Sequence, residues 1–199
     1  EISLRMLGIS RPCSADQENE MEEFSHIKSL DLAGNLLSDW EAVFIIMKQL
    51  SNNLQSVSLA SNRINDLTVS PSLSMEGMIK LNLNNTNINS FKTIQLIGEA
   101  MPNLEDLCVA HCDLSDIEYC NKLSAFQQLV LLDLSDCNLT SWEKQVLLPL
   151  QTLPKLQSLI LNDNKIDEIN NAYDEKGELP IFKALASLQL AGTSISSWS

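Results

Sequence analysis

One pattern of apolar and polar positions recurs along the chain. Its clearest copy, LVLLDLSDCNLTSWE at residues 129–143, has leucine at its first, fourth, sixth and eleventh positions and Cys137 at its ninth. Apolar residues that alternate with polar ones from the fourth position predict a short strand with one buried face, which a turn then ends. Six further copies begin at Ile27, Leu54, Met78, Leu104, Leu156 and Leu185.

The spacing of the copies predicts the architecture. Successive fourth positions are separated by 28, 27, 24, 26, 25, 27 and 29 residues. Units of this length are typical of the leucine-rich repeat, in which each unit touches only its neighbours. We therefore predict an α/β leucine-rich repeat solenoid, a curved horseshoe with a parallel concave sheet of about eight strands and helices on the convex side. The strands are expected around Ile2, Leu30, Val57, Leu81, Leu107, Leu132, Leu159 and Leu188.

The ninth position of each copy carries a side chain that can make hydrogen bonds. A buried polar group at this point is expected to satisfy backbone groups of the turn, each of which would cost about 1–3 kcal/mol if left unpaired. Asparagine does this directly, whereas threonine and cysteine offer a weaker hydroxyl or thiol. The expected ladder residues are Asn35, Asn62, Thr86, Cys112, Cys137, Asn164 and Thr193.

The fourteenth position predicts the convex helices. It is apolar in every copy, at Trp40, Leu67, Phe91, Ile117, Trp142, Ile169 and Trp198. The three tryptophans could form a recognition surface, but an apolar residue at one shared position is better explained by core packing. Helical spacing follows Trp40, Phe91 and Trp142. Capping boxes at Ser38-x-x-Glu41, Ser115-x-x-Glu118 and Thr140-x-x-Glu143 predict the helix starts.

Three stretches interrupt the rhythm. Residues 65–77 contain Pro71 and Gly77 and are expected to replace a helix with a looser segment. Residues 167–180 read as an acidic loop on the convex side or its lower edge, and residues 10–26 as an acidic run with a short helix that ends near His26. The chain starts inside a strand pattern and stops where a helix is expected. We therefore interpret residues 1–199 as a single leucine-rich repeat domain, a fragment of a longer multidomain protein.

Charge and cysteine content narrow the classes of partner. The chain has 13 basic and 26 acidic residues, a formal charge of −13 that disfavours nucleic acid and anionic membrane surfaces. Basic or mixed-charge proteins fit better. The five cysteines include no clustered terminal caps, which favours a reducing, intracellular compartment. Glycosylation sequons at Asn84 and Asn138 are interpreted as accidental.

Candidate catalytic chemistry is sparse. The chain has only two histidines, and neither lies in a nucleophile, phosphate-loop or metal motif, so we expect neither an enzyme nor a bound cofactor or small-molecule substrate. Cys108-x-x-His111-Cys112 is the one cluster that resembles a metal or thiol site. In the repeat frame Cys112 points inward while Cys108 and His111 face the concave side, so a structural interpretation is favoured and no metal is expected.

Positions three, five and eight of each copy are expected to face the open concave side. In the fourth to sixth copies, Leu131 and Ile160 lie among aspartates, and an apolar centre with a polar rim is typical of protein interfaces. The alternative is an ordinary acidic surface with two stray aliphatic residues. The predicted partner-binding residues are Asp106, Cys108, His111, Leu131, Asp133, Asp136, Ser158, Ile160 and Asp163.

Four stretches resemble the leucine-rich repeat domain of the tubulin-folding cofactor E family. They are residues 2–5 (ISLR), 29–40 (SLDLAGNLLSDW), 156–161 (LQSLIL) and 193–198 (TSISSW), and the resemblance spans essentially the whole chain. It implies a cytoplasmic, cytoskeleton-associated chaperone that binds α-tubulin and works with other tubulin-folding cofactors. It also implies a glycine-rich cytoskeleton-associated domain before the repeats and a ubiquitin-like domain after them. A paralogue without the first domain would look the same.

Three hypotheses follow for the function. The first is a binding module of a tubulin-folding cofactor, whose concave surface holds α-tubulin or a sister cofactor during assembly or disassembly of the tubulin heterodimer. The second is an acidic repeat scaffold for basic proteins. The third is the recognition arm of an enzyme whose catalytic domain is absent. Salt dependence separates the first two, because binding of a basic protein weakens steeply with ionic strength.

Overall fold

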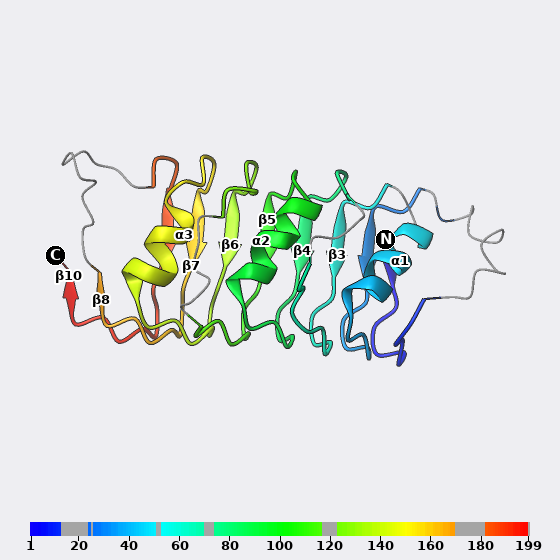
Figure 1. Cartoon of the computed structure of the whole chain (residues 1–199), viewed down its shortest axis with the longest axis horizontal. Coiled ribbons are helices and arrows are strands. Elements are labelled where there is room, and N and C mark those ends of the chain that lie inside the picture. The colour runs from blue at the N-terminus through cyan, green and yellow to red at the C-terminus, as the bar shows by residue number, and fades with distance from the viewer. Residues whose placement is uncertain are drawn as a thin grey trace.

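The computed structural model describes residues 1–12, 24, 26–50, 53–69, 74–116, 123–169 and 182–198. Eight short parallel strands stack side by side in chain order, from right to left in Figure 1. The predicted solenoid and its register are confirmed, because every fourth position pairs with the fourth position of the next repeat. The strands are β1 (Ile2–Ser3), β2 (Ser29–Asp31), β3 (Ser56–Ser58), β4 (Lys80–Asn82), β5 (Asp106–Cys108), β6 (Leu131–Asp133), β7 (Ser158–Ile160) and β9 (Ser187–Gln189).

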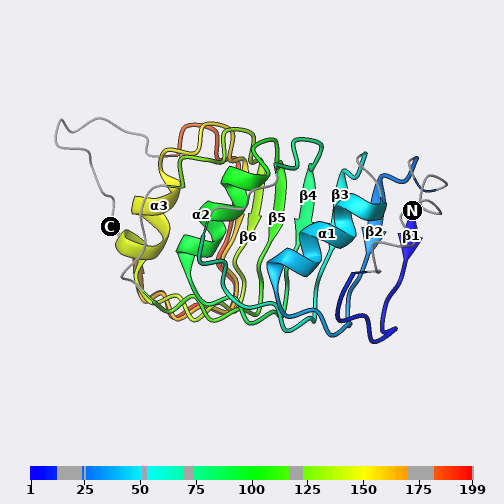
Figure 2. The same ribbon diagram turned by 45° about the vertical axis from the view of Figure 1, so that its right-hand side comes forward.

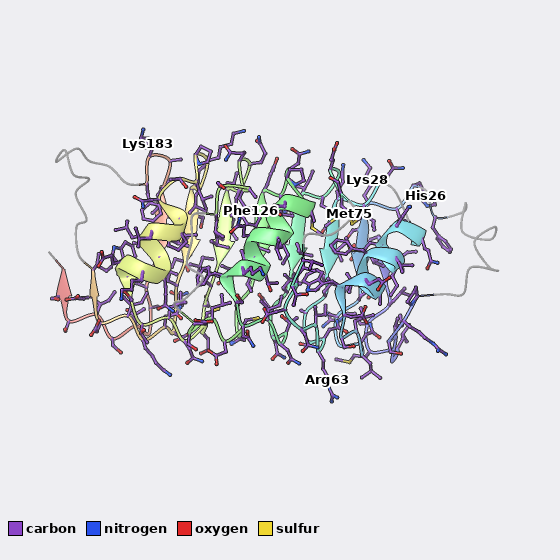
Figure 3. The ribbon with its side chains drawn as sticks, viewed as in Figure 1. His26, Lys28, Arg63, Met75, Phe126 and Lys183 are labelled. Carbon is purple, nitrogen blue, oxygen red and sulfur yellow. The ribbon has the colours of Figure 1, made fainter. Side chains whose placement is uncertain are left out.

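The core lies between this sheet and the convex side. The middle residue of each strand from β2 to β7 is at most 1% exposed, and the sixth and eleventh positions of these repeats are fully buried. Tight packing extends to backbone: a Cβ on Gly98 would lie 2.9 Å from the ring of Phe126, which Figure 3 labels near α2. The apolar skeleton read from the sequence is therefore the packed interior of the solenoid.

The ninth-position ladder is buried as predicted from Asn35 to Asn164, whereas Thr193 is only half-buried. Each asparagine joins two turns rather than one. Asn62 Nδ2 donates to the carbonyls of Leu59 in its own repeat and Leu32 in the preceding repeat, both at 2.9 Å. Asn62 Oδ1 accepts the amide of Leu37 at 3.1 Å. Asn35 and Asn164 repeat this arrangement. The ladder thus fastens neighbouring repeats together along the edge where the strands end.

The convex helices differ from the prediction of one helix per repeat. Helices cover alternate repeats: α1 (Trp40–Leu50), α2 (Phe91–Ala100) and a helix that runs from η2 (Trp142–Leu147) into α3 (Leu148–Leu150). The repeats that contain a helix are 27, 26 and 27 residues long, measured between successive fourth positions. The intervening repeats are 24 and 25 residues long and contain no helix in their described parts. A helix is about 10 Å wide and strands are about 4.8 Å apart, so alternate repeats suffice to cover the convex side.

In the last two repeats, short strands replace the convex helix. β8 (Glu168–Ile169), at the start of the stretch predicted as an acidic loop, pairs in parallel with β10 (Ser197–Trp198), where a helix start was predicted. Ile169 is nevertheless buried, at 4% exposed, as the fourteenth position predicts. Trp40, Leu67, Phe91 and Trp142 are also buried, whereas Ile117 and the side chain of Trp198 lie outside the described part of the chain. The core interpretation holds for the described side chains at this position. The prediction of a helix start at Trp198 was wrong, and residues 168–169 form a strand rather than part of a loop.

Helix starts also differ in detail from the predicted capping boxes. α1 begins after Asp39, whose Oδ1 accepts the amide of Ala42 at 2.8 Å. The third helix is capped by Ser141, one residue later than predicted, and begins with a π-helical turn in which the Leu148 amide donates to Glu143. Pro149 has no amide to give to the helix, which favours such a wider turn. Glu118 and most of residues 10–26 and 167–180 lie outside the described residues.

Two further predictions concern extent and location. The described parts of residues 65–77 contain no helix, which agrees with the looser segment predicted there. No helix within the described residues has the length and apolar content needed to cross a bilayer. The assignment of residues 1–199 to a single domain stays a prediction.

Candidate functional site

The open face of the sheet carries three rows of side chains across neighbouring strands. Figure 2 shows the three described helices on one side of the sheet, so none of these helices covers the concave face. Register pairing joins Asp106, Leu131 and Ser158 into one row, and Cys108, Asp133 and Ile160 into the next. His111, Asp136 and Asp163 occupy the turns that follow the same strands. All nine predicted residues therefore lie together on β5, β6, β7 and their turns.

Leu131 and Ile160 are neighbours, but not direct ones. Leu131 pairs with Ser158, and Ile160 pairs with Asp133, so the two aliphatic side chains lie on a diagonal between β6 and β7. Diagonal neighbours are about 7–8 Å apart, rather than the roughly 5 Å of directly opposed residues that adjacent strands alone would predict. Both side chains are half-buried. The apolar centre is thus a partly shielded diagonal with Asp133 and Ser158 at its other two corners.

The carboxylates around this diagonal differ in how they are held. Asp106 Oδ2 lies 3.4 Å from Nζ of Lys80 and forms an ion pair with it. Lys80 belongs to β4, the strand that precedes the site. Asp133 Oδ1 accepts both the amide and the hydroxyl of Ser135, at 3.0 Å and 2.6 Å. These two hydrogen bonds hold the Asp133 carboxylate against the turn that follows its own strand.

The eighth-position row is defined by its backbone. His111, Asp136 and Asp163 have φ angles of 59°, 50° and 59°, in the left-handed region, and the eighth positions of the other repeats share it. Asparagine, aspartate and histidine tolerate this conformation better than most residues, and glycine tolerates it best. His111 Nδ1 lies 2.9 Å from Asp136 Oδ2, with both side chains more than half exposed. The residue types at the eighth position thus indicate a left-handed backbone, which the alternation of apolar and polar residues alone does not reveal.

The cysteine and histidine cluster does not converge. Burial, followed by repulsion from Asp106 and Asp133, raises the pKa of the Cys108 thiol to about 12. Cys112 is buried in the ladder, where its Sγ lies 3.4 Å from Thr86 Oγ1, while His111 points to Asp136. Within the described residues, no group of three His, Cys, Asp or Glu side chains is arranged to hold a metal ion. Cys112 therefore belongs to the buried ladder, whereas Cys108 and His111 lie on the concave side and do not face it.

A polar hollow extends the concave site over the edge where the strands end. Its volume is about 740 Å³, and it reaches from the early repeats to Asp136. The lining residues are Ser61, Asn84, Asn85, His111, Cys112, Asp113, Asp136 and Asn138. Asp113 accepts hydrogen bonds from Ser115 and from Asn138, which lower the pKa of its carboxyl group. Since two of the lining residues are Asp113 and Asp136, the acidic character of the site continues into this hollow.

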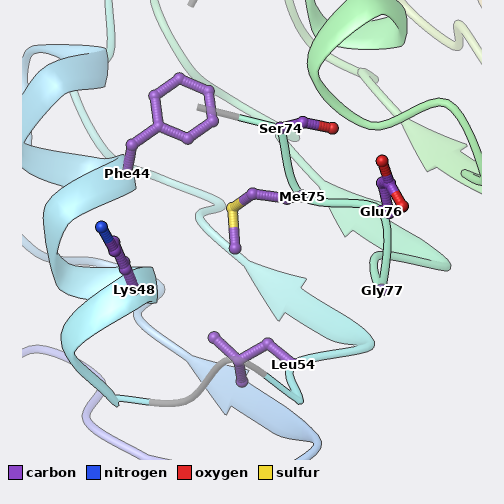
Figure 4. Close-up of a pocket in the computed structure, with 7 residues that line it drawn as sticks. All are labelled: Phe44, Lys48, Leu54, Ser74, Met75, Glu76 and Gly77. Carbon is purple, nitrogen blue, oxygen red and sulfur yellow. The ribbon is translucent and has the colours of Figure 1, made fainter. Parts of the chain in front are cut away.

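A smaller cavity of about 300 Å³ lies on the convex side, where α1 borders a repeat with no described helix. Figure 4 shows Met75 reaching toward α1 between Phe44 and Leu54, with Lys48 and Glu76 at the margin. Ser74 and Gly77 complete the described lining. The Met75 amide is tied to the carbonyl of Ala100 at 2.7 Å. The floor of this cavity is apolar, and Lys48 and Glu76 at its margin do not converge on a common point. We therefore interpret it as a packing gap between repeats.

Sequence comparison identifies relatives over nearly the whole chain. The chain is 29% identical to human tubulin-specific chaperone cofactor E-like protein over 99% of its length and 45% of that protein. It is 29% identical to tubulin-specific chaperone E of Xenopus laevis, over 94% of the chain and 36% of the relative. It is 32% identical to tubulin-folding cofactor E of Arabidopsis thaliana, over 85% of the chain and 32% of the relative. The resemblance predicted from the motifs is confirmed.

The chain therefore spans less than half the length of these curated relatives. No protein-family profile matches it. Among solved structures, internalin InlF of Listeria monocytogenes matches with a TM-score of 0.60 and 20% identity, over 87% of this chain and 44% of that one. Human trophoblast glycoprotein 5T4 matches with a TM-score of 0.61 and 23% identity, over 85% and 62%. At these identities the structural matches establish the fold alone.

Proposed function

Because this chain is a leucine-rich repeat protein related in sequence to tubulin-specific chaperone E proteins, we propose that it is the protein-binding module of a tubulin-folding factor. In this role it engages α-tubulin, or another tubulin-folding cofactor, during assembly or disassembly of the tubulin heterodimer. It acts in the cytoplasm in association with the cytoskeleton. It holds its partner by shape and charge and makes or breaks no covalent bond.

The observation that supports this proposal is the half-buried Leu131 and Ile160 diagonal within a frame of carboxylates. The register of β6 and β7 fixes the spacing of the two side chains, because both strands pair in one parallel sheet. Interfaces are distinguished by such an apolar centre with a polar rim rather than by apolar area as a whole. A few central residues of this kind commonly supply most of the binding free energy.

Asp133 further defines the partner group that fits. The Asp133 carboxylate is fixed by Ser135 and lies directly opposite Ile160. A group that covers Ile160 must therefore present apolar surface and positive charge side by side. Lysine and arginine do this with an apolar stem and a charged end. The concave site is suited to a partner segment that places such a side chain over the β6 and β7 strands.

An acidic scaffold for basic proteins remains the second candidate, because the chain carries a charge of −13. The two candidates differ in how much of the affinity is electrostatic. Affinity that falls steeply between low and physiological salt indicates general attraction of basic proteins. Affinity that persists at physiological salt indicates a partner that uses the apolar centre.

Capture of purified soluble tubulin tests the proposal. The immobilised chain is exposed to tubulin at physiological ionic strength, with a basic protein such as lysozyme as the control for general electrostatic capture. Retention of tubulin, and loss of that retention when Leu131 and Ile160 are both replaced by serine, supports the proposal. Retention of lysozyme alone favours the acidic scaffold, and retention of neither protein rejects both candidates.

A further inference from the structure

Lys80 is the one cation in the strands of the concave sheet, all of whose residues are described. The other charged residues of these strands are Asp31, Asp106 and Asp133. Register pairing places Lys80 on β4 directly opposite Asp106 on β5, and Asp106 in turn opposite Leu131 on β6. A cation thus lies at the border of the concave site, one strand away from its first carboxylate.

The ion pair between Lys80 and Asp106 is exposed to solvent. Lys80 Nζ lies 3.4 Å from Asp106 Oδ2, and the two side chains are 62% and 28% exposed. Ion pairs at such sites contribute little to the free energy of unfolding, because solvent screens the attraction and both side chains lose rotamer freedom. The main effect of Lys80 is therefore on the charge of the concave face, where it offsets the carboxylate of Asp106.

Asp133 has no such counter-ion. Within the described residues, no Lys, Arg or His side chain forms an ion pair with Asp133. Its carboxylate is held by Ser135, and its backbone lies between those of Cys108 on β5 and Ile160 on β7 in the register of the sheet. Of the two carboxylates on β5 and β6, one is thus paired with a lysine and the other is available to a cation of a partner.

Cys108 lies where the fields of these charged groups meet. Its Sγ lies 3.7 Å from Oδ1 of Asp106, and the residue is directly opposite Asp133. Burial is the largest cause that raises the pKa of this thiol to about 12, the two carboxylates raise that pKa further, and Lys80 lowers it. The field of Lys80 therefore reaches the centre of the concave site, where it opposes the field of the carboxylates.

Distance decides where Lys80 repels a second cation. A partner cation at Asp106 would have to share one carboxylate with the Lys80 ammonium, and like charges around one group repel each other. A partner cation at Asp133 would lie two strands from Lys80, or about 10 Å. That separation exceeds the Debye length of about 8 Å at physiological ionic strength, so the repulsion is largely screened. The concave face therefore admits a cation at Asp133 and opposes one at Asp106.

We propose that Lys80 determines the specificity of the concave site by confining the cation of a partner to Asp133. The site then accepts a segment in which one Lys or Arg lies between apolar side chains that cover Leu131 and Ile160, and it rejects a polybasic segment. Specificity of this kind depends on repulsion of the wrong partner as well as on attraction of the right one. The inference rests on the proposed function and deepens it, because it states which segment of a partner the concave site takes.

Fluorescence anisotropy with two defined peptides at physiological ionic strength tests the proposal. The single-cation peptide is short and fluorescein-labelled, with one Lys between two Leu residues and Ser at its other positions. The polybasic peptide has the same length and keeps the Leu-Lys-Leu centre, with Lys in place of each Ser. Although the chain has a formal charge of −13, we expect the polybasic peptide to bind at least about threefold more weakly than the single-cation peptide.

Variants of Lys80 locate the cause of this preference. Lys80→Met keeps an apolar stem and removes the charge, and should strengthen binding of the polybasic peptide by about tenfold while changing binding of the single-cation peptide little. Lys80→Gln is a second neutral variant with the same expected result. The matched control is Lys92→Met, which removes one exposed positive charge from α2 and should alter neither affinity.

Two further variants test the roles of the carboxylates. Asp133→Asn should weaken binding of the single-cation peptide by about tenfold, since it removes the carboxylate that receives the cation. Asp106→Asn, added to Lys80→Met, should return binding of the polybasic peptide to its original weak value, because Lys80 acts by excluding cations from Asp106. Denaturant unfolding of each variant should give the midpoint of the original chain, as expected for an exposed ion pair.

The outcomes separate the role of Lys80 from general charge. Equal strengthening of polybasic binding by Lys80→Met and Lys92→Met overturns the proposal, because net charge alone then explains the result. Absence of binding of the single-cation peptide to the original chain also overturns it. Capture of tubulin is measured separately: a chain that prefers the single-cation peptide but retains no tubulin rejects the proposed function and supports the role of Lys80. A chain that retains tubulin but shows no peptide preference overturns the role of Lys80 alone.

Discussion

Ile160 on β7 lies directly opposite Asp133 on β6, so the two apolar residues of the concave site are separated by a diagonal step. The Asp133 carboxylate is drawn toward its own turn by Ser135, which leaves it close to Ile160 and fixed in direction. Each aliphatic side chain is thus bordered by a polar residue on the neighbouring strand. This alternation favours a partner with mixed apolar and cationic character over one with a flat apolar surface.

Replacement of a ladder asparagine should destabilise the solenoid. Asn62→Ala removes the side chain that serves Leu32, Leu37 and Leu59, and Asn164→Ala removes its equivalent. Each change is expected to lower the free energy of unfolding by about 1–3 kcal/mol, since buried backbone groups lose their partners. Asn65→Ala is the control, because the Asn65 side chain is exposed. Denaturant unfolding measures the three values, and equal small losses would contradict the ladder.

Gln145 is expected to be as sensitive as the ladder, although it lies outside the repeat pattern. Its side chain is fully buried; Oε1 accepts the amides of Thr140 and Ser141, and Nε2 donates to the carbonyls of Leu114 and Ser115. Gln145→Leu should lower the free energy of unfolding by at least about 2 kcal/mol. Gln151→Leu, at the partly exposed residue that directly follows α3, serves as the control. Equal unfolding midpoints for the two variants would argue against this role.

The thiols should be unreactive, including the one on the concave face. Burial is the main cause that raises the pKa of both Cys108 and Cys137 to about 12, from an ordinary 9.0. At neutral pH their thiolate fractions are therefore on the order of a thousandfold below that of a free cysteine. Native-state labelling, followed by mass spectrometry, should modify both residues far more slowly than a model thiol. Rapid modification of Cys137 in the folded chain would refute its placement in the core.

The same pKa shift predicts how stability depends on pH. Since the folded chain holds the Cys137 proton more tightly than the unfolded chain does, this thiol contributes stability that is fully present below about pH 9. That contribution is lost as the pH rises toward about 12. The free energy of unfolding should therefore fall less steeply above about pH 9 in Cys137→Ala than in the original chain. Parallel pH profiles for the two proteins would contradict the prediction.

Eighth-position carboxylates should act mainly on the rate of partner association. Asp136→Asn and Asp163→Asn remove charge, and asparagine tolerates the left-handed backbone at both sites. The association rate with tubulin should fall by about tenfold at low salt, with little change in the dissociation rate. Surface plasmon resonance at low and high salt measures both rates. A loss that persists at high salt would indicate direct contact rather than long-range attraction.

The sequence predicted the sheet in detail because the register depends on local spacing. Each buried leucine and each ladder residue recurs at a fixed offset, and the strands pair at those residues. The convex side was harder to predict, since a helix there depends on the space left by neighbouring helices as well as on apolar spacing. Ile169 has the apolar residue type of a helix start and lies instead in β8.

The candidate site was predicted as a set of residues but not as an arrangement. Strand alternation placed all nine residues on one face, yet the diagonal between Leu131 and Ile160 follows from comparing third and fifth positions across two strands. Hydrogen bonds such as those of Gln145 to Leu114 and Ser115 connect residues of adjacent repeats and leave no periodic signal. The left-handed row had such a signal in its Gly, Asn, Asp and His residues.

The dissociation constant of tubulin for the Leu131→Ser, Ile160→Ser double variant tests the central claim most directly. Both side chains face away from the core, so the variant should fold normally while its affinity falls by at least about 2 kcal/mol, or roughly 30-fold. Ser56→Ala with Ser58→Ala, on the concave face of β3, is the matched control and should bind as the original chain does. Full tubulin affinity in a folded double variant would contradict the assignment of the concave face.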